Sequence, residues 1–124
     1  MLVYLMIALG GAVGAMSRFA LTRWVNGFAT SVFPWATFSI NLLGSCLMGI
    51  CFVVVTERMP SLAPLRPLIM VGFLGAFTTF STFSLEIVSL IHQQAWLSAI
   101  SYLLLSSLLG VTGAAAGVII ARLV

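Results

Sequence analysis

Charged side chains are too sparse in this chain to cover the surface of a soluble domain. Of its 124 residues, 62% are hydrophobic and only 6% are charged. A folded soluble protein needs far more polar cover than this. Between the charges run apolar tracts long enough to cross the hydrocarbon of a bilayer, which takes about 20 helical residues. We therefore expect an integral membrane protein with one domain over residues 1–124, and no room for a second, soluble domain.

Four membrane-spanning helices fit the sequence. Turn residues and prolines separate the apolar tracts, and Pro34 suits a first helical turn. Trp24, Trp35 and Trp96 fall near the expected helix ends, where indole rings favour the membrane–water boundary. The expected helices cover residues 2–25, 34–56, 67–92 and 96–122. The third is expected to be interrupted or loosened near Gly75, because glycine weakens a helix.

Small residues recur at four-residue spacing along these helices. The pairs are Gly10 and Gly14, Gly11 and Ala15, Ser45 and Gly49, Gly110 and Ala114, and Gly113 and Gly117. Such patterns allow helices to approach closely in lipid. Packing within one subunit explains any single pair, but so many small faces on four short helices favour an oligomer.

The arginines give only a weak orientation signal. With four spans, Arg58, Arg66 and Arg122 share a side of the membrane with both termini, and Arg18 and Arg23 lie toward the other side. Three positive charges against two is a small bias, so insertion in both orientations is expected, although chance gives such a balance equally well. The net charge of +3 comes from these helix-end arginines and indicates no nucleic-acid partner.

The third predicted helix contains the most unusual segment, GFLGAFTTFSTFS at residues 72–84. Its hydroxyl residues are Thr78, Thr79, Ser81, Thr82 and Ser84, and the phenylalanines between them are Phe77, Phe80 and Phe83. One or two such hydroxyls could bond back to carbonyls one turn earlier. Five of them at bilayer depth, beside phenyl rings whose edges are positive, favour a path for a small anion that sheds its water.

Polar residues elsewhere allow two interpretations each. Asn41, in the middle of the second helix, is either a clamp between helices or a donor that faces a pathway. Arg18 either extends to the headgroups or pairs with a helix C-terminus. Tyr102, Ser106 and Thr112 lie roughly on one face of the fourth helix, where they either extend a polar stripe or pack against neighbours.

At these residues the chain resembles the Fluc, or CrcB, family of fluoride channels. The resemblance covers nearly the whole length, through GGAVGAMSR at 10–18, TFSINLLGS at 37–45 and GFLGAFTTFSTFSLE at 72–86. The TTFSTFS core is specific, whereas the glycine-rich first motif is weak alone. The resemblance implies an all-α integral membrane fold with four transmembrane helices per subunit and a broken third helix. It also implies an antiparallel, dual-topology homodimer with two fluoride pores.

The same resemblance implies roles for individual residues. The implied fluoride-pore residues are Asn41, Phe80, Phe83, Ser81, Thr82, Tyr102 and Ser106. A sodium ion at the dimer centre would be held by the backbone carbonyls of Gly75 and Thr78. The expected function is passive exit of fluoride from the cytoplasm, which gives fluoride resistance, and the expected location is a bacterial inner membrane. No enzymatic activity is expected.

Three other functions share some of these features. A proton-driven, dual-topology drug exporter would need a buried carboxylate, and no carboxylate precedes Glu57 in the chain. An intramembrane hydrolase would need a nucleophile with a base, and His92 is the only histidine. A packing subunit without transport activity explains the small residues but leaves the hydroxyl–phenylalanine segment without a role.

Overall fold

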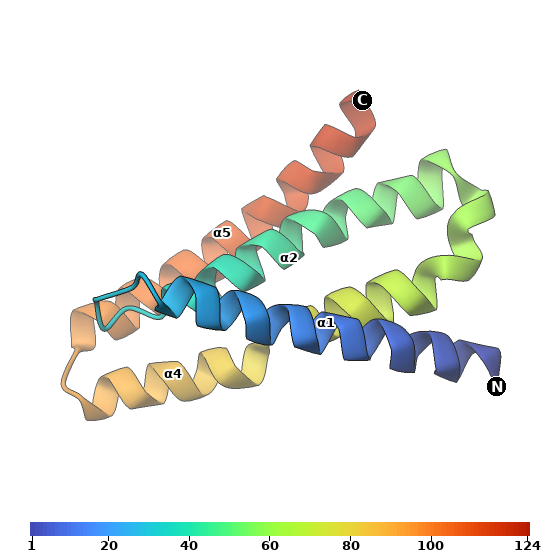
Figure 1. Cartoon of the computed structure of the whole chain (residues 1–124). Helices are drawn as coiled ribbons and strands as arrows, with labels where there is room; N and C mark the ends of the chain where they lie inside the picture. The colour runs from blue at the N-terminus through green and yellow to red at the C-terminus, as the bar shows by residue number, and fades with distance from the viewer.

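The computed structural model describes the whole chain, residues 1–124, and all its regular structure is helical (Figure 1). In chain order the elements are α1 (Leu2–Asn26), α2 (Trp35–Val53), η1 (Val54–Arg58), η2 (Pro60–Leu65), η3 (Pro67–Leu74), α3 (Gly75–Phe77), α4 (Phe80–His92) and α5 (Trp96–Leu123). The elements η1 and η3 are wide π-helical segments, and η2 is a tight 3₁₀ segment that joins them.

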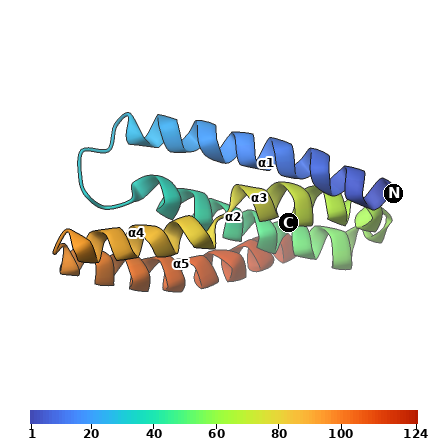
Figure 2. The same ribbon diagram turned by 90° about the horizontal axis from the view of Figure 1, so that it is seen from below.

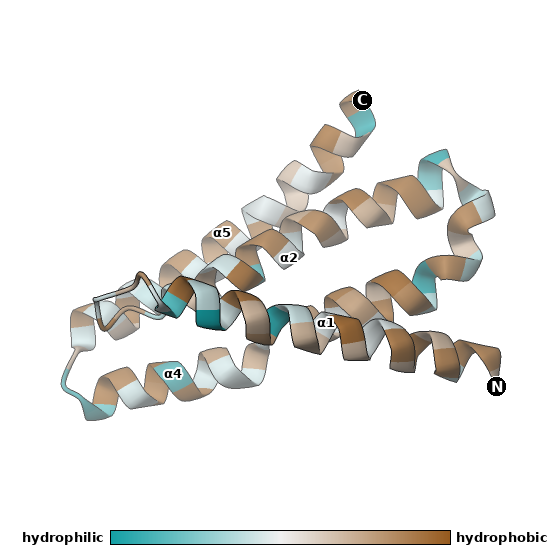
Figure 3. Ribbon diagram, in the orientation of Figure 1, coloured by the Kyte–Doolittle hydropathy of each residue, from teal (hydrophilic) through white to brown (hydrophobic).

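Four segments are long and apolar enough to cross a membrane, which confirms the predicted number of spans. They are Leu2–Asn26, Trp35–Arg58, Pro67–His92 and Trp96–Leu123. The bounds predicted from the sequence lie within two residues of these. Hydropathy follows the same pattern, because hydrophobic residues cover most of the long helices (Figure 3). Hydrophilic residues lie at helix ends and connections and at a few positions within α1 and α4 (Figure 3).

Both termini and the connection formed by η1 and η2 lie at one end of the molecule (Figures 1 and 2). At that end Arg122 forms an ion pair with Glu57, at 2.5 Å between Nη2 and Oε1. Arg58 donates a hydrogen bond to the Arg122 carbonyl at 2.8 Å. These exposed contacts join the end of the second span to the end of the fourth. In a chain that crosses the membrane four times, these two ends lie on the same side.

The helices pack in pairs, α2 along α5 and α1 along η3 and α3. Gly49 and Gly117 bring α2 and α5 together, because a Cβ atom on Gly49 would overlap the Ala114 carbonyl oxygen and one on Gly117 would overlap that of Cys46. Gly10 and Gly14 meet the backbone of η3 in the same way. These four glycines therefore serve packing within one subunit.

Enlarging Gly117 is expected to destabilise the fold. In Gly117→Val the new side chain meets the carbonyl of Cys46, which cannot rotate away, and overpacking of this kind costs roughly 1–3 kcal/mol. Thermal unfolding of the detergent-purified protein, followed by size-exclusion chromatography, measures the loss. Ala116→Val, at an exposed position on the same helix, is the control. Equal melting temperatures for the two variants would contradict the packing described here.

An aromatic core lies between α4 and α5. Phe83, Leu90, Ala99 and Tyr102 form a buried cluster. Phe33, from the connection between α1 and α2, packs against it. The connection from α4 to α5 is short because Gln94 adopts a left-handed conformation, with φ of 59°, and reverses the chain. This core positions the first turns of α4, where the hydroxyl–phenylalanine segment lies.

Candidate functional site

Two residues leave the helical conformation between α3 and α4. Thr78 has φ −79° and ψ 159°, and Thr79 has φ −151° and ψ 117°, so both are extended. Gly75 itself remains helical, with φ −64° and ψ −35°. The departure from the helix therefore lies at the two threonines, three residues after the glycine.

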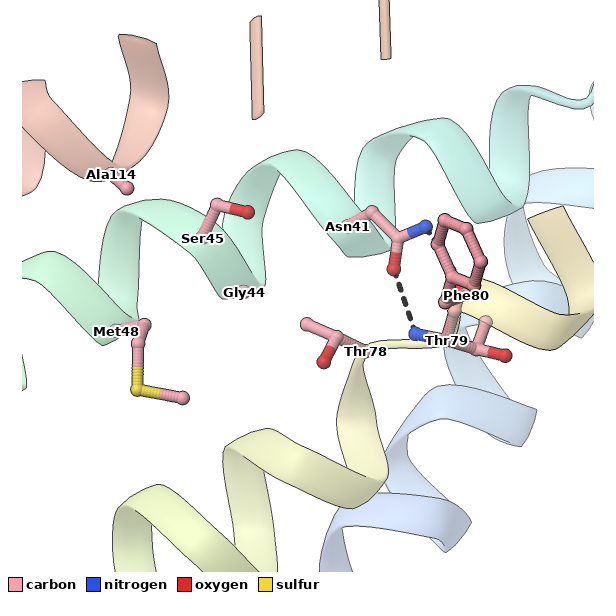
Figure 4. A pocket seen from close by; sticks show the side chains of 8 residues that line it. All are labelled: Asn41, Gly44, Ser45, Met48, Thr78, Thr79, Phe80 and Ala114. Carbon is pink, nitrogen blue, oxygen red and sulfur yellow. Dashed lines mark hydrogen bonds between the residues drawn. The ribbon is translucent and has the colours of Figure 1, made fainter. Parts of the chain in front are cut away.

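The carboxamide of Asn41 holds this extended segment. Its Oδ1 accepts a hydrogen bond from the Thr79 backbone N–H at 2.8 Å (Figure 4). Its Nδ2 donates one to the Thr79 carbonyl at 3.0 Å. Asn41 therefore supplies, from the middle of α2, the partners that a continuous helix would have given Thr79. An Asn amide has two N–H donors, so one remains available after these bonds.

Thr79 also caps the N-terminus of α4. Its hydroxyl accepts a hydrogen bond from the Thr82 backbone N–H at 3.3 Å and donates one to the Thr82 hydroxyl at 3.0 Å. Threonine is a favoured residue at this position because its side chain satisfies one of the unpaired amides of the first turn. The TTFST part of the segment thus encodes a helix start.

The Gly75 and Thr78 carbonyls are among those that lose their helical donors as a result. In a continuous α-helix the N–H of Thr79 would bond to the Gly75 carbonyl, and that of Thr82 to the Thr78 carbonyl. Here these N–H groups donate to Asn41 and to the Thr79 hydroxyl instead. No group of three or more His, Cys, Asp or Glu side chains lies together in the chain. The freed backbone carbonyl oxygens are of the kind that suits a hard cation.

The remaining hydroxyls of the segment differ in their hydrogen-bond partners and in their exposure. Thr78 donates to the Leu74 carbonyl at 3.0 Å, and Ser84 donates to the Phe80 carbonyl at 2.9 Å. These two follow the alternative in which the side chain bonds back by one turn. Ser81 is exposed at the first turn of α4.

A cavity of about 320 Å³ lies where α2 faces the extended segment (Figure 4). Its lining residues are Asn41, Gly44, Ser45, Met48, Thr78, Thr79, Phe80 and Ala114. Gly44 allows the close approach of the two elements, because a Cβ atom there would overlap the Thr78 methyl group. The Phe80 ring stands beside the Asn41 amide in this view (Figure 4).

A neighbouring cavity of about 200 Å³ collects four of the residues predicted for the pore. Asn41, Phe80, Phe83 and Ser106 all line it. The ring centroids of Phe80 and Phe83 are 5.8 Å apart with an interplanar angle of 44°. Phe83 is 7% exposed, whereas Phe80 is 79% exposed. The Ser106 hydroxyl is buried and has no hydrogen-bond partner in the chain.

Thr82 lines a different cavity, of about 260 Å³, on the side of α1. Arg18, Thr37 and Glu86 line it as well. The Arg18 Nε atom is buried and makes no hydrogen bond in the chain. Thr79 lies between the two regions, because it lines both this cavity and the 320 Å³ cavity. The hydroxyl–phenylalanine segment therefore faces three cavities, of about 320, 200 and 260 Å³.

Tyr102 lies in the core beside these cavities. It is 0% exposed, and its hydroxyl donates to Oε2 of Glu86 at 2.7 Å. Thr37 donates to the other carboxylate oxygen at 2.8 Å. Neither Thr37 nor Glu86 was predicted from the sequence to be a functional residue. The signal that could have identified Glu86 is that it is the only carboxylate in the third span. Thr112, the last member of the expected α5 stripe, bonds back to the Leu108 carbonyl at 2.9 Å.

Comparison with known proteins gives one consistent result. Residues 5–118 match the family model described as CrcB-like protein, Camphor Resistance (CrcB). A fluoride-specific ion channel FluC from Hahella chejuensis is 50% identical over 118 residues, covering 95% of this chain and 93% of the relative. The FluC of Magnetococcus marinus is 47% identical, covering 95% and 96%. That of Saccharophagus degradans is 43% identical, covering 97% and 90%.

These matches extend over nearly the whole chain and include all four spans. The four spans and the family make the chain a multi-pass membrane protein, and the relatives point to a bacterial inner membrane. The chain belongs to the CrcB family, whose relatives named here are fluoride channels and not enzymes.

Proposed function

We propose that this chain forms a fluoride-selective channel through which fluoride leaves the cytoplasm passively. One observation carries the proposal. A single cavity joins the Asn41 amide, the rings of Phe80 and Phe83, and the buried, unpaired hydroxyl of Ser106, with no charged residue in its lining. The names of the relatives, fluoride-specific ion channel FluC, support the same ion.

The chemistry of this cavity suits fluoride. A strongly hydrated anion gives up its water only where several hydrogen-bond donors replace it. Asn41 has a free N–H, Ser106 a free hydroxyl, and phenyl rings present positive edges. Because none of these groups carries a full charge, fluoride binds and still moves on. A narrow path walled by phenylalanines excludes chloride by its size and its poorer match to the donors.

The first turn of α4 extends this path. The first backbone N–H groups of a helix have no acceptor within the helix, and here Thr79 caps only that of Thr82. The helix dipole makes this end positive. Thr82, on that turn, adds a hydroxyl to an approach from the 260 Å³ cavity. Ser81 adds an exposed hydroxyl on the same turn. The interruption of the third span at Thr78 and Thr79 thus presents a helix N-terminus to an anion at membrane depth, where broken backbone is tolerated only beside protein or a cavity.

The working unit is an antiparallel homodimer. In one subunit the exposed Phe80 and the cavity beside Asn41 and Ser45 would face lipid, which does not satisfy polar groups. A second copy covers them, and the nearly balanced arginines allow it to insert oppositely. With Cys46 and Cys51 changed to alanine, a membrane-impermeant thiol reagent is expected to label Val124→Cys from both sides. Labelling from one side only would overturn dual topology.

A sodium ion at the centre of the dimer is part of this proposal. The carbonyls of Gly75 and Thr78 have lost their helical donors, and two copies together bring four such oxygens. Freed carbonyls of an unwound membrane helix are good ligands for sodium. The ion would supply positive charge beside the anion path and hold the two interrupted helices in place.

In a cell, the membrane potential drives fluoride outward through such a pore. Each 100 mV, inside negative, contributes about 2.3 kcal/mol per elementary charge. Expression of this chain in a bacterium that lacks its own fluoride channel is therefore expected to restore growth in fluoride and to lower cytoplasmic fluoride. Unchanged fluoride sensitivity, with the protein present in the membrane, would contradict the proposed function.

A further inference from the structure

Three residues are common to two of the cavities at the candidate site. The 320 Å³ and 200 Å³ cavities share Asn41, Ser45 and Phe80 in their linings, and no other residue. Asn41 and Ser45 are four positions apart on α2, so their side chains lie one turn apart on the same face of that helix (Figure 4). An ion that moves from one cavity to the other therefore passes both side chains. The proposed path uses the Asn41 amide and the Phe80 ring here and assigns nothing to Ser45.

The hydroxyl of Ser45 is free to donate to a ligand. A serine inside a membrane helix commonly donates to the carbonyl one turn earlier. Ser45 makes neither such a bond nor any other within the chain, unlike Ser107, which donates to the Leu103 carbonyl at 2.8 Å. The other two hydroxyls in the lining of the 320 Å³ cavity, those of Thr78 and Thr79, already donate within the chain. Ser45 therefore has the only free hydroxyl of that cavity.

The neighbouring face of α5 lacks hydroxyls at the level where Ser45 supplies one. One and two turns after Ser106, the same face of α5 carries Gly110 and Ala114. Gly110 lines the 200 Å³ cavity together with Ser106, and Ala114 lines the 320 Å³ cavity. A Cβ atom on Gly110 would lie 3.8 Å from the Ser45 hydroxyl oxygen, which is an ordinary contact distance. The Ser45 hydroxyl thus lies over Gly110 and continues, from α2, the donors that stop at Ser106 on α5.

We propose that Ser45 binds fluoride through its hydroxyl as the ion moves between the 200 Å³ and 320 Å³ cavities. The inference rests on the proposed function, in which the ion passes Asn41. An anion that leaves the free N–H of Asn41 and the hydroxyl of Ser106 needs another donor within reach, because apolar lining does not replace its water. No charged side chain lines either cavity, so nothing there holds the ion too tightly. Ser45 carries the path out of one cavity and into the next.

Ser45→Ala tests this, because it removes only the hydroxyl. We expect the fluoride flux per assembled channel in liposomes to fall roughly tenfold, as for the loss of one hydrogen bond to a charged group. Adding Gly110→Ser to Ser45→Ala returns a hydroxyl to the same space from the neighbouring helix, and the 3.8 Å spacing leaves room for its Cβ atom. This double variant should regain most of the flux. Ser101→Ala, whose hydroxyl donates to the Ser98 carbonyl outside both cavities, is the matched control.

Rescue separates a role in the ion path from a role in packing. Gly110→Ala in the Ser45→Ala background adds the same bulk without a hydroxyl and should restore nothing. Rescue by both residues at position 110, or by neither, overturns the inference. If Gly110→Ser does not assemble, Ser45→Thr and Ser45→Val decide, because the two side chains match in shape and only threonine keeps a hydroxyl. Equal flux in these two variants overturns the inference as well.

Two further outcomes are distinguishable. If the Ser45 hydroxyl served only to bond a second copy of the chain, Ser45→Ala would lower the amount of assembled protein, seen by size exclusion, and leave the flux per channel unchanged. That result overturns the inference. Wild-type flux in Phe83→Ile would instead overturn the proposed function. Loss of flux in Phe83→Ile together with wild-type flux in Ser45→Ala would refute the role of Ser45 alone.

Discussion

Replacing Phe83 or Phe80 by isoleucine will cut fluoride flux sharply while the proposed dimer stays assembled. Isoleucine is apolar but has no positive ring edge to present to an anion. The expected loss is roughly 10- to 100-fold, the factor that corresponds to losing one contact with a charged group. Fluoride efflux from liposomes that contain matched amounts of each protein, recorded with a fluoride electrode, measures it.

The two replacements are expected to differ in their effect on thermal stability. This difference helps to distinguish a role in the pore from a role in the packing of the core. Phe83 is 7% exposed and packs on Tyr102, so some loss of thermal stability accompanies its replacement. Phe80 is 79% exposed in the subunit, so its replacement leaves the subunit fold intact. Phe52→Ile, on an exposed part of α2, is the control and should retain full flux. Wild-type flux in both pore variants would mean that the path lies elsewhere.

The Asn41→Ala variant is expected to lose both stability and flux. Alanine removes the donor and the acceptor that pair with Thr79, and each buried group left unpaired costs about 1–3 kcal/mol. The extended segment then loses its anchor on α2, and the proposed fluoride path loses an amide donor. Thermal unfolding and liposome efflux on the same preparation give both quantities.

Asn26→Ala is the matched control for this change. Asn26 is the only other asparagine in the chain and is exposed at the end of α1. We expect its replacement to leave melting temperature and flux at the wild-type values. If Asn41→Ala behaved like Asn26→Ala in both measurements, neither the clamp on Thr79 nor the donor role of Asn41 would stand.

The four spans were predictable because the signals that define them are local. Apolar tracts of sufficient length, ended by Pro, Gly and Trp residues, give helix bounds within two residues of the structure. The position of the extended residues could not be predicted from the neighbouring sequence. Gly75 marks the region, but the chain leaves the helix at Thr78 and Thr79, where Asn41 from a distant segment takes over the backbone bonds.

The sequence singles out the residues of the candidate site, whose pore role stays a prediction, but it does not give their geometry. In the sequence Thr82 stands between Phe80 and Phe83, yet a helix turns about 100° per residue and carries it to the opposite side. Thr82 accordingly faces Arg18 and Glu86, while the two rings share a cavity with Ser106. The Thr37–Glu86 contact joins residues 49 positions apart, and no local pattern predicts it.

The central claim, a pore selective for fluoride, is tested most directly by ion efflux from liposomes that contain only this protein. Vesicles loaded with potassium fluoride or potassium chloride are diluted into salt without these anions, and valinomycin balances the charge. We predict rapid fluoride efflux, chloride efflux no faster than from protein-free vesicles, and no dependence of fluoride efflux on an imposed proton gradient. Chloride efflux as fast as that of fluoride, or fluoride efflux no faster than the protein-free leak, would contradict the account.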